Sequence, residues 1–466
     1  MKKIAIIHGD LDTPLQRKAI ALLSELVLDY TLEYPICIPV SKADEFCGYF
    51  RIFVGTSRSN EYIREHSRGE MTHAEQYSIK VKDQNAIIEG SDDAGAVYGC
   101  IDFYNKYLIP LEFPHDPNRY RLNPFDRDLP DFEHSSYPSI KRRGIWTWGH
   151  VIYDYRGFID NMVKLKLNTL IIWNDHPPIN AREIVEYAHS LNIKLIWGYS
   201  WLWDTNCGEF SIDFIEGSVD DIVKKCEEEY LPLGGDGIYF QSFTETCKEY
   251  VGGVLIADAV THLVNTAASR IFEGHPDLEL QFGLHSESVK NKLDFIKKVD
   301  PRVRIVWENC GAFPFSYIPK RVENFDETVD FVKKIAHLRD PDERFGVVTK
   351  GLIKLDWGSF EHLEGPMNIG VCSEKMAKNR IERKRKIWRY IQAYWLTYAP
   401  KAHEMARVLC EEKNGDLDVT ALVEDAMFEK QIVFPAALYA EMLWDVNADT
   451  MRLINEVALR DYVDFV

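Results

Sequence analysis

Three carboxylic residues follow or end apolar, strand-like runs in the middle and later parts of the chain: Glu245, Glu308 and Asp356. Cleavage of a glycosidic bond needs one carboxylic acid that protonates the leaving oxygen and a second carboxylate that attacks the sugar or activates water. Because the three carboxylates come from three different strands, they predict this chemistry, with Glu245 as the acid and Glu308 or Asp356 as its partner.

Each carboxylate also has a structural interpretation. Glu245 would suit the first turn of a helix, where the helix dipole stabilises a negative charge. Glu308 would suit a corner that binds substrate without reacting with it, and Asp356 would suit an ion pair with a nearby lysine. The residues alone leave these alternatives open.

Polar and aromatic residues at the same strand ends are candidates for binding a sugar. Tryptophan rings stack on the apolar faces of sugars, although packing in a core is their commoner use. His285 suits a hydroxyl ligand better than a base. No metal site or organic cofactor is implied. The predicted substrate-binding residues are Trp148, His150, Asp175, Trp201, Gln241, His285, Trp307, Asn309, Lys354 and Trp357.

The segment 350–357 carries two lysines and a carboxylate within one predicted strand. Neighbouring side chains on a strand point to opposite faces, so the apolar set identifies the face that packs against the helices. The prediction places Gly351, Ile353 and Leu355 on the outer face and Lys350, Leu352, Lys354 and Asp356 inside.

Two inward lysines need more than one opposite charge, because a buried ammonium group without a partner is costly. Either Glu308 or another carboxylate of the interior pairs with the second lysine, or the substrate brings an anionic group. Lys354 lies closer to the strand end than Lys350 does, so it is the better candidate for a substrate contact.

From residue 140 onward, strand-like runs alternate with amphipathic helical segments, which indicates repeated βα units. Eight strands, the last placed at residues 368–371, match a TIM barrel, whose reaction site lies at the carboxyl ends of the strands. A doubly wound open sheet is the alternative, but no glycine-rich phosphate loop follows any of the strands.

The remaining regions divide the chain further. Residues 1–108 are predicted to form a small α/β domain, with Ser91 or Asp92 capping its last helix, and residues 109–138 form a proline-rich linker. The barrel is expected over 139–372. Residues 373–466 are predicted to be helical, and the basic run within them is interpreted as a solvated helix face.

Composition narrows the class of protein. The chain has 466 residues, of which 46% are hydrophobic and 27% charged, with a net charge of −18. This acidic balance argues against a nucleic-acid partner. No apolar run suits a membrane span, and the short N-terminal run does not suit a signal peptide, so a cytoplasmic protein is expected. The nine cysteines are scattered, which favours reduced thiols. The sequence leaves open whether the protein forms a homo-oligomer.

Two groups of glycosidases share this layout. The helix DDAGAVYGCIDFYNKYL, the barrel opening YPSIKRRGIW and the unit FIDNMVKLKLNTLIIW resemble family 20 β-N-acetylhexosaminidases and family 67 α-glucuronidases. The resemblance implies a small α/β domain beside a catalytic barrel, and a hexosaminide or uronide as substrate. Family 20 enzymes carry an Asp-Glu pair after the fourth strand. Here the pair is Thr244-Glu245, so the acid is kept and the carboxylate that orients the acetamido group is missing.

The resulting prediction is a divergent relative that hydrolyses a small oligosaccharide from its end. One alternative is a barrel that binds carbohydrate without catalysis. Another is a sugar-acid lyase or isomerase, which would use Lys354 or His285 as a base, together with a metal.

Overall fold

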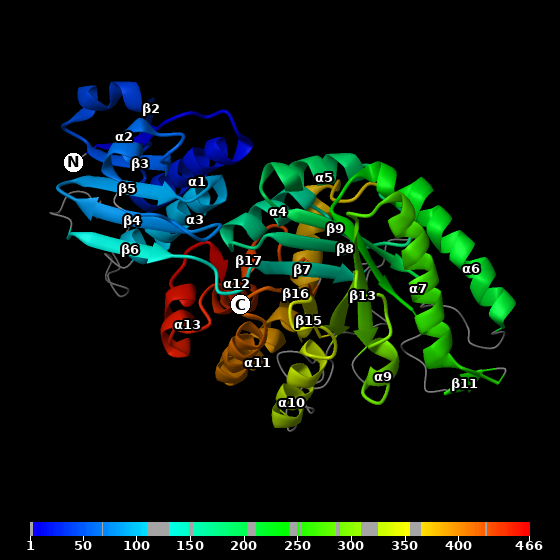
Figure 1. Ribbon diagram of the computed structural model, residues 1–466. Helices are drawn as coiled ribbons and strands as arrows, with labels where there is room; N and C mark the ends of the chain where they lie inside the picture. The colour runs from blue at the N-terminus through cyan, green and yellow to red at the C-terminus, as the bar shows by residue number, and fades with distance from the viewer. Residues whose placement is uncertain are drawn as a thin grey trace. The chain divides into compact units, whose positions relative to one another are not determined.

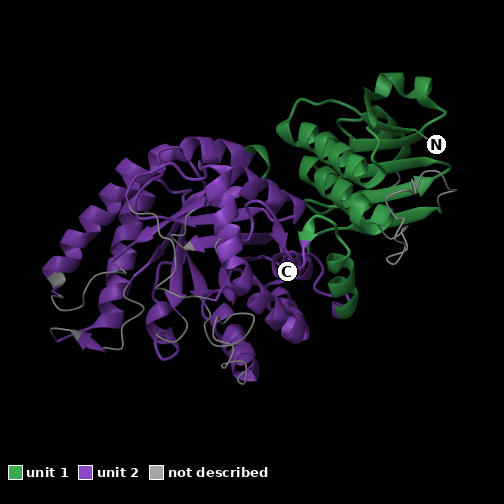
Figure 2. Cartoon of the chain, turned by 180° about the vertical axis from the view of Figure 1, so that it is seen from behind, with its two compact units in different colours: residues 1–138, 190–192, 451–463 green, residues 139–189, 193–450, 464–466 purple. Residues whose placement is uncertain are grey.

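The computed structural model describes residues 3–67, 69–109, 130–148, 152–202, 211–242, 249–251, 253–285, 289–308, 325–354, 365–424 and 426–466. The chain divides into two compact units, coloured separately in Figure 2. The first comprises residues 1–138, 190–192 and 451–463, and the second comprises the rest. No helix in the described ranges is both long and apolar enough to cross a lipid bilayer.

The first unit is a mixed sheet of six strands in the order β2-β1-β3-β5-β4-β6. The first four strands in that order run parallel, and β4 is antiparallel to both of its neighbours. The elements are β1 (Ile4–His8), α1 (Pro14–Thr31), β2 (Ile36–Pro39), β3 (Phe50–Thr56), α2 (Glu61–His66), β4 (Tyr77–Lys82), β5 (Asn85–Gly90), α3 (Asp93–Phe103), β6 (Phe132–Ser136) and most of α13 (Thr450–Ala458).

Helix α3 begins where the sequence predicts. The Asp92 carboxylate accepts a hydrogen bond from the Gly95 backbone N–H at 2.7 Å and so caps the helix. A Cβ atom at Gly99 would lie only 2.7 Å from Ile88 Cγ2. The small residues therefore let α3 lie directly on the sheet.

The second unit is a closed barrel of eight parallel strands, which confirms the predicted TIM barrel (Figure 1). Its strands are hydrogen-bonded in chain order around the barrel. They are β7 (Arg142–Trp148), β8 (Thr169–Trp173), β9 (Lys194–Ser200), β10 (Gly237–Gln241), β13 (Glu279–His285), β14 (Val303–Glu308), β15 (Phe345–Leu352) and β16 (Leu417–Val423).

Helices follow the strands and cover the outside of the barrel; most are amphipathic, whereas every residue of α12 is buried (Figure 1). In α4, for example, Phe158, Ile159 and Met162 form one buried face. The helices are α4 (Tyr155–Lys164), α5 (Ala181–Ser190), α6 (Ile212–Lys225), α7 (Ile256–Gly274), α9 (Leu293–Ile296), α10 (Phe325–Ala336), α11 (Glu374–Lys413) and α12 (Phe434–Trp444).

The eighth strand is β16, and the prediction of a strand at residues 368–371 is wrong. β16 pairs with β15 on one side and with β7 on the other, which closes the barrel. The segment 368–371 instead contacts a loop, where the Gly370 N–H donates to the Ile152 carbonyl at 2.6 Å. A four-residue run with an internal glycine offers less apolar surface than the seven residues of β16. The region after residue 372 is therefore only partly helical.

The end of the barrel at which the strands begin is closed by four charged residues, here called the floor cluster: Arg142, Glu279, Arg304 and Asp418. Arg142 Nη1 lies 2.8 Å from Glu279 Oε2 and 3.4 Å from Asp418 Oδ2, and Arg304 binds the same two carboxylates. Burial raises the pKa of Glu279, but the two guanidinium groups outweigh it and lower the pKa to about 2. Glu279 is therefore ionised at neutral pH, whereas burial raises the pKa of Asp418 despite the same guanidinium groups. The cluster joins four strands.

We expect Arg304→Leu to lower the free energy of unfolding by about 3 kcal/mol, because it removes one of the two guanidinium groups that bind the buried Glu279 carboxylate and the one that lies nearest to Asp418. All 11 tryptophans lie in the barrel unit, so denaturation followed by tryptophan fluorescence reports on this unit. Arg302→Leu is the matched control, since its partner Asp300 forms an exposed pair that is worth about 0–1 kcal/mol. Equal losses in the two variants would contradict a stabilising floor cluster.

The same cluster predicts a pH dependence. The pKa of Glu279 in the folded protein lies below its usual 4.5, so its contribution to stability is complete above that pH and is lost as the pH falls toward 2. Acid denaturation of Glu279→Gln should therefore be less steep between these values.

Candidate active site at the carboxyl ends of the barrel strands

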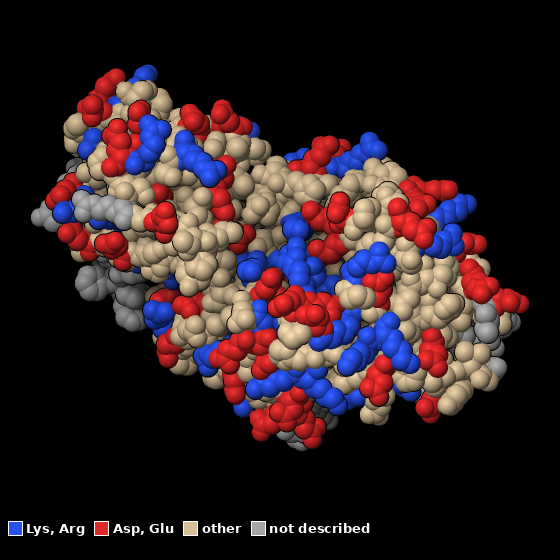
Figure 3. Space-filling view, in the orientation of Figure 1, with Lys and Arg blue, Asp and Glu red and all other residues tan. Residues whose placement is uncertain are grey.

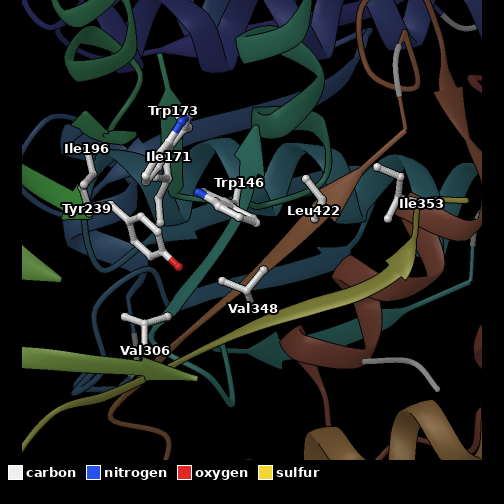
Figure 4. Packing of buried hydrophobic residues seen from close by; sticks show 9 residues of the cluster. All are labelled: Trp146, Ile171, Trp173, Ile196, Tyr239, Val306, Val348, Ile353 and Leu422. Carbon is white, nitrogen blue, oxygen red and sulfur yellow. The ribbon is translucent and has the colours of Figure 1, made fainter. Parts of the chain in front are cut away.

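The interior of the barrel is filled by an apolar layer. Rings from three strands meet there: the centroid of Tyr239 lies 5.4 Å from that of Trp146 and 6.2 Å from that of Trp173 (Figure 4). A substrate site must therefore lie beyond this layer, toward the strand ends. The other members of the layer are Ile171, Ile196, Val306, Val348, Ile353 and Leu422.

A buried ion pair adjoins the aromatic layer. Lys350 Nζ lies 2.9 Å from Glu308 Oε2, and the Tyr239 hydroxyl donates to Glu308 Oε1 at 2.6 Å. The Gln241 amide N–H also donates to Glu308. Glu308 is the last residue of β14 and has no exposed surface. We call Glu308, Lys350, Tyr239 and Gln241 the Glu308 network.

Glu308 is anionic in this setting. Burial alone would raise the pKa of its carboxyl, but the charge of Lys350 and the three hydrogen bonds together bring the pKa below its usual value. Burial and the neighbouring anion raise the pKa of Tyr239, which therefore stays protonated and donates. An ionised, fully buried carboxylate is not a proton donor, so the geometry does not suit Glu308 as a general acid.

Gly283 makes room for this network on β13. A Cβ atom there would lie 2.5 Å from Glu308 Oε1 and would collide with the Tyr239 hydroxyl. The strand that carries Gly283 also carries His285 two residues later, so both residues point to the interior. His285 ends β13 and is partly exposed, which suits its predicted place at the mouth of the barrel.

The predicted orientation of the seventh strand is correct for Lys350 and wrong beyond it. The register between β15 and β16 shifts by one residue, because Thr349 is opposite Ala421 while Leu352 is opposite Val423. An extra residue in one strand reverses the alternation after it. Ile353, predicted to face outward, consequently joins the interior layer.

Lys354 consequently points away from the interior. Its side chain is exposed, and its ammonium group lies 4.7 Å from the ring centroid of Tyr390 in α11. The predicted inward orientation of Lys354 is therefore wrong, because its side chain lies against α11 and not in the barrel interior.

Two of the predicted substrate-binding tryptophans pack on the outer side of the strands. Trp201 stacks on Phe240 with ring centroids 3.6 Å apart, and Trp307 lies 4.8 Å from Phe331 of α10. Phe240 and Trp307 each directly neighbour an inward residue, so alternation turns both outward. The structure thus places Trp201 and Trp307 in the core between strands and helices.

Asp175 and Gln241 lie at the strand ends, as the sequence predicts. Asp175 Oδ1 accepts a hydrogen bond from the Ser200 N–H at 2.8 Å, which ties the end of β8 to that of β9. Gln241 is buried, and its Oε1 has no hydrogen-bond partner in the described part of the chain. It is therefore an available acceptor at the carboxyl end of β10. The predicted residues Glu245, Asp356, His150, Asn309, Trp357 and the side chain of Trp148 lie outside the described residues.

Sequence reasoning missed Glu424, which directly follows the eighth strand. Its Oε1 binds Lys384 Nζ at 3.2 Å and its Oε2 accepts from the Lys354 N–H at 3.1 Å. The sequence does carry a signal for this strand: the pair Asn414-Gly415, which suits the end of a helix, directly precedes the apolar run of β16. In the structure both residues have positive φ and end α11. Recognising that strand would have put a carboxylate at its end.

The basic run at the start of α11 is only partly solvated, contrary to its interpretation as a solvated face. Arg380 has no exposed surface and lies 2.9 Å from Glu429, and Lys384 is buried against Glu424. Residues four apart share a helix face. One face of the run therefore neutralises two carboxylates that follow β16.

No protein-family model and no curated protein matches the chain. Solved structures do match it. A chitobiase from Flavobacterium johnsoniae is 13% identical, with a TM-score of 0.54 over 98% of this chain and 68% of its own. A β-N-acetylhexosaminidase from Bacteroides fragilis is 12% identical, with a TM-score of 0.51 over 96% of this chain and 88% of its own.

The chain shares its fold with several glycoside hydrolases. A family 138 enzyme that targets pectin rhamnogalacturonan II is also similar, at 12% identity and a TM-score of 0.54, over 98% of this chain. This chain spans about half of that enzyme, since the match covers 52% of it. The resemblance to family 20 is thus confirmed at the level of the fold.

We expect Lys350→Met to lower the free energy of unfolding by about 3–5 kcal/mol, because it leaves the Glu308 anion buried without its counter-charge. The double variant with Glu308→Gln should recover most of this loss, since the amide needs no cation. Denaturation of the two single variants and the double variant measures the coupling directly. Lys354→Met is the control and should cost less than about 1 kcal/mol. Additive losses would show that the two groups do not interact.

Proposed function

We propose that the protein is a glycoside hydrolase that removes sugar units from the end of a small, neutral oligosaccharide. The observation that supports this proposal is the Glu308 network. It places an ionised, fully hydrogen-bonded carboxylate at the strand ends of a barrel with a glycoside hydrolase fold. Barrels of this kind carry their reactive groups on the loops beyond those ends.

Glu245 is the proposed acid. It follows Gln241, the last residue of β10 and a member of the Glu308 network, by four positions in the sequence. Protonating the leaving oxygen requires a carboxyl group that is neutral before the reaction. The Glu308 carboxylate does not meet this requirement, because its negative charge is already matched by Lys350.

Asp356 is the proposed second carboxylate, acting as a nucleophile or as the base that activates water. It follows Leu352, the last residue of β15, by four positions. Glu308 then has a positioning role: its anion holds Lys350, Tyr239 and Gln241 in place at the base of the site. His285, Asp175 and Gln241 are the described residues proposed to bind sugar hydroxyls.

Glu245→Gln should lower turnover about 100-fold to 10,000-fold on glycosides with poor leaving groups, and much less on aryl glycosides whose phenols are acidic. An activated phenol leaves without protonation, so the acid matters only where the leaving oxygen is basic. The measurement is kcat/KM on a panel of α- and β-linked aryl glycosides, including glucosides, N-acetylglucosaminides and glucuronides.

Glu249→Gln is the matched control, because Glu249 is exposed nearby and pairs with Lys292. It should leave both substrate types within about two-fold of the wild type. Equal losses of Glu245→Gln on both substrate types would remove Glu245 as the acid. Binding of the sugars without any turnover by the wild type would favour a barrel that only binds carbohydrate.

The neutral charge of the substrate follows from the two lysines. Lys350 is matched by Glu308, and Lys354 lies over Tyr390. Both lysines that would have favoured a uronide thus have partners within the protein. Lys354→Met should change KM for a glucuronide and for the matching glucoside by the same factor, less than about two-fold. A rise in KM for the glucuronide alone would show that Lys354 contacts the substrate, and it would contradict the proposal that the substrate is neutral.

A further inference from the structure

An open hollow of about 560 Å³ lies between the loop that follows β7 and the first turns of α11. Tyr153 lines it from the loop, and Met376, Asn379, Glu382 and Arg383 line it from the helix. Spacings of three and four residues put these four side chains on one face of α11. The volume falls in the range of small-molecule binding sites.

The aromatic wall of this hollow is held in place from behind. The guanidinium carbon of Arg380 lies 4.3 Å from the ring centroid of Tyr153, and Arg380 is fixed in turn by Glu429 at 2.9 Å. The Cys372 thiol also donates to the Tyr153 carbonyl oxygen at 3.2 Å. Because the ring is already ordered, a ligand that packs against it loses little binding free energy to ordering.

The hollow belongs to the barrel end that carries the proposed active site. The segment that leads into α11 is bonded to the loops after β7 and β8, through Gly370 N–H to Ile152 O at 2.6 Å and Ile179 N–H to Met367 O at 3.1 Å. Two apolar side chains of these segments are exposed, Ile179 at 69% and Val371 at 68%. The connecting segments therefore present apolar surface at this end of the barrel.

The lining matches a neutral sugar. Glu382 accepts hydrogen bonds, Arg383 donates them and Asn379 does both, which suits hydroxyl groups that are donors and acceptors at once. The opposite charges of Glu382 and Arg383 are adjacent, so the hollow favours neither an anion nor a cation. The Tyr153 ring and Met376 supply apolar surface for the C–H face of a sugar ring.

We propose that this hollow binds a neutral sugar unit of the substrate that is remote from the bond being cleaved. The proposal rests on the function proposed above, and it assigns the protein a substrate longer than one sugar. Tyr153 and Asn379 are then residues that determine preference for chain length, and they do not take part in the chemistry.

The first test measures binding separately from turnover. Glu245→Gln protein is titrated by calorimetry with tetrasaccharides of glucose, mannose, galactose, xylose and N-acetylglucosamine, and with the corresponding monosaccharides. At least one tetrasaccharide should bind. Adding Tyr153→Ala or Asn379→Ala should raise the Kd of that tetrasaccharide about 10-fold, which corresponds to a loss of about 1.4 kcal/mol of binding free energy. Lys378→Ala, an exposed neighbour on α11 outside the lining, is the matched control and should have no effect.

The second test measures kcat/KM of otherwise unaltered protein. Asn379→Ala should raise KM for the tetrasaccharide about 10-fold and leave the aryl monosaccharide within about two-fold. Asn379 is exposed, so the variant folds even where Tyr153→Ala does not. If Asn379→Ala leaves kcat/KM unchanged on both substrates, the hollow is not a sugar site, and the proposed hydrolase function is unaffected. If a tetrasaccharide binds and Asn379→Ala weakens that binding, but the protein cleaves nothing, the proposed hydrolase function is wrong and the sugar site stands. If no tetrasaccharide binds at all, the proposal of a sugar site in the hollow is wrong.

Discussion

The arrangement of the barrel interior near the strand ends depends on the buried anion of Glu308. A carboxylate without exposed surface is stable only if charge and hydrogen bonds replace the water that it has lost. Lys350, Tyr239 and Gln241 provide them from two other strands. Each of these side chains must therefore reach the same point, and a fourth strand must carry a glycine, Gly283, where any side chain would collide with the network.

This constraint also limits the chemistry. A carboxylate that is held ionised has no proton to give, which rules out Glu308 as the general acid. In the function proposed above, the Glu308 network positions its neighbours, and the reactive groups come from the segments that follow the strands. That division is common in barrels, where loops carry function on a rigid scaffold. The bulge in β15 has a similar effect: by reversing the alternation after Lys350, it puts Ile353 in the interior and turns Lys354 outward.

Charge is distributed along the barrel in two separate places. The floor cluster joins the starts of four strands, and the Glu308 network joins strands near their ends, with the aromatic layer of Trp146, Trp173 and Tyr239 adjoining the latter. On the outer surface, by contrast, acidic and basic side chains are interspersed over the face drawn in Figure 3. The net charge of −18 thus reflects a mixed surface and not one continuous acidic face on that side.

The sequence by itself determined the repeating βα architecture, the small α/β region before it and the start of α3 at Asp92, because these depend on local periodicity and capping. It also placed Lys350 in the interior by strand alternation, which is a local property, and it named Glu308, Gln241 and His285 as residues at the strand ends. Only the tertiary structure decided that β16 is the eighth strand, that Lys354, Trp201 and Trp307 leave the interior, and that Lys350 neutralises Glu308. Strand closure, a bulge and a buried ion pair each depend on residues far apart in the chain, and no local pattern records which of them meet.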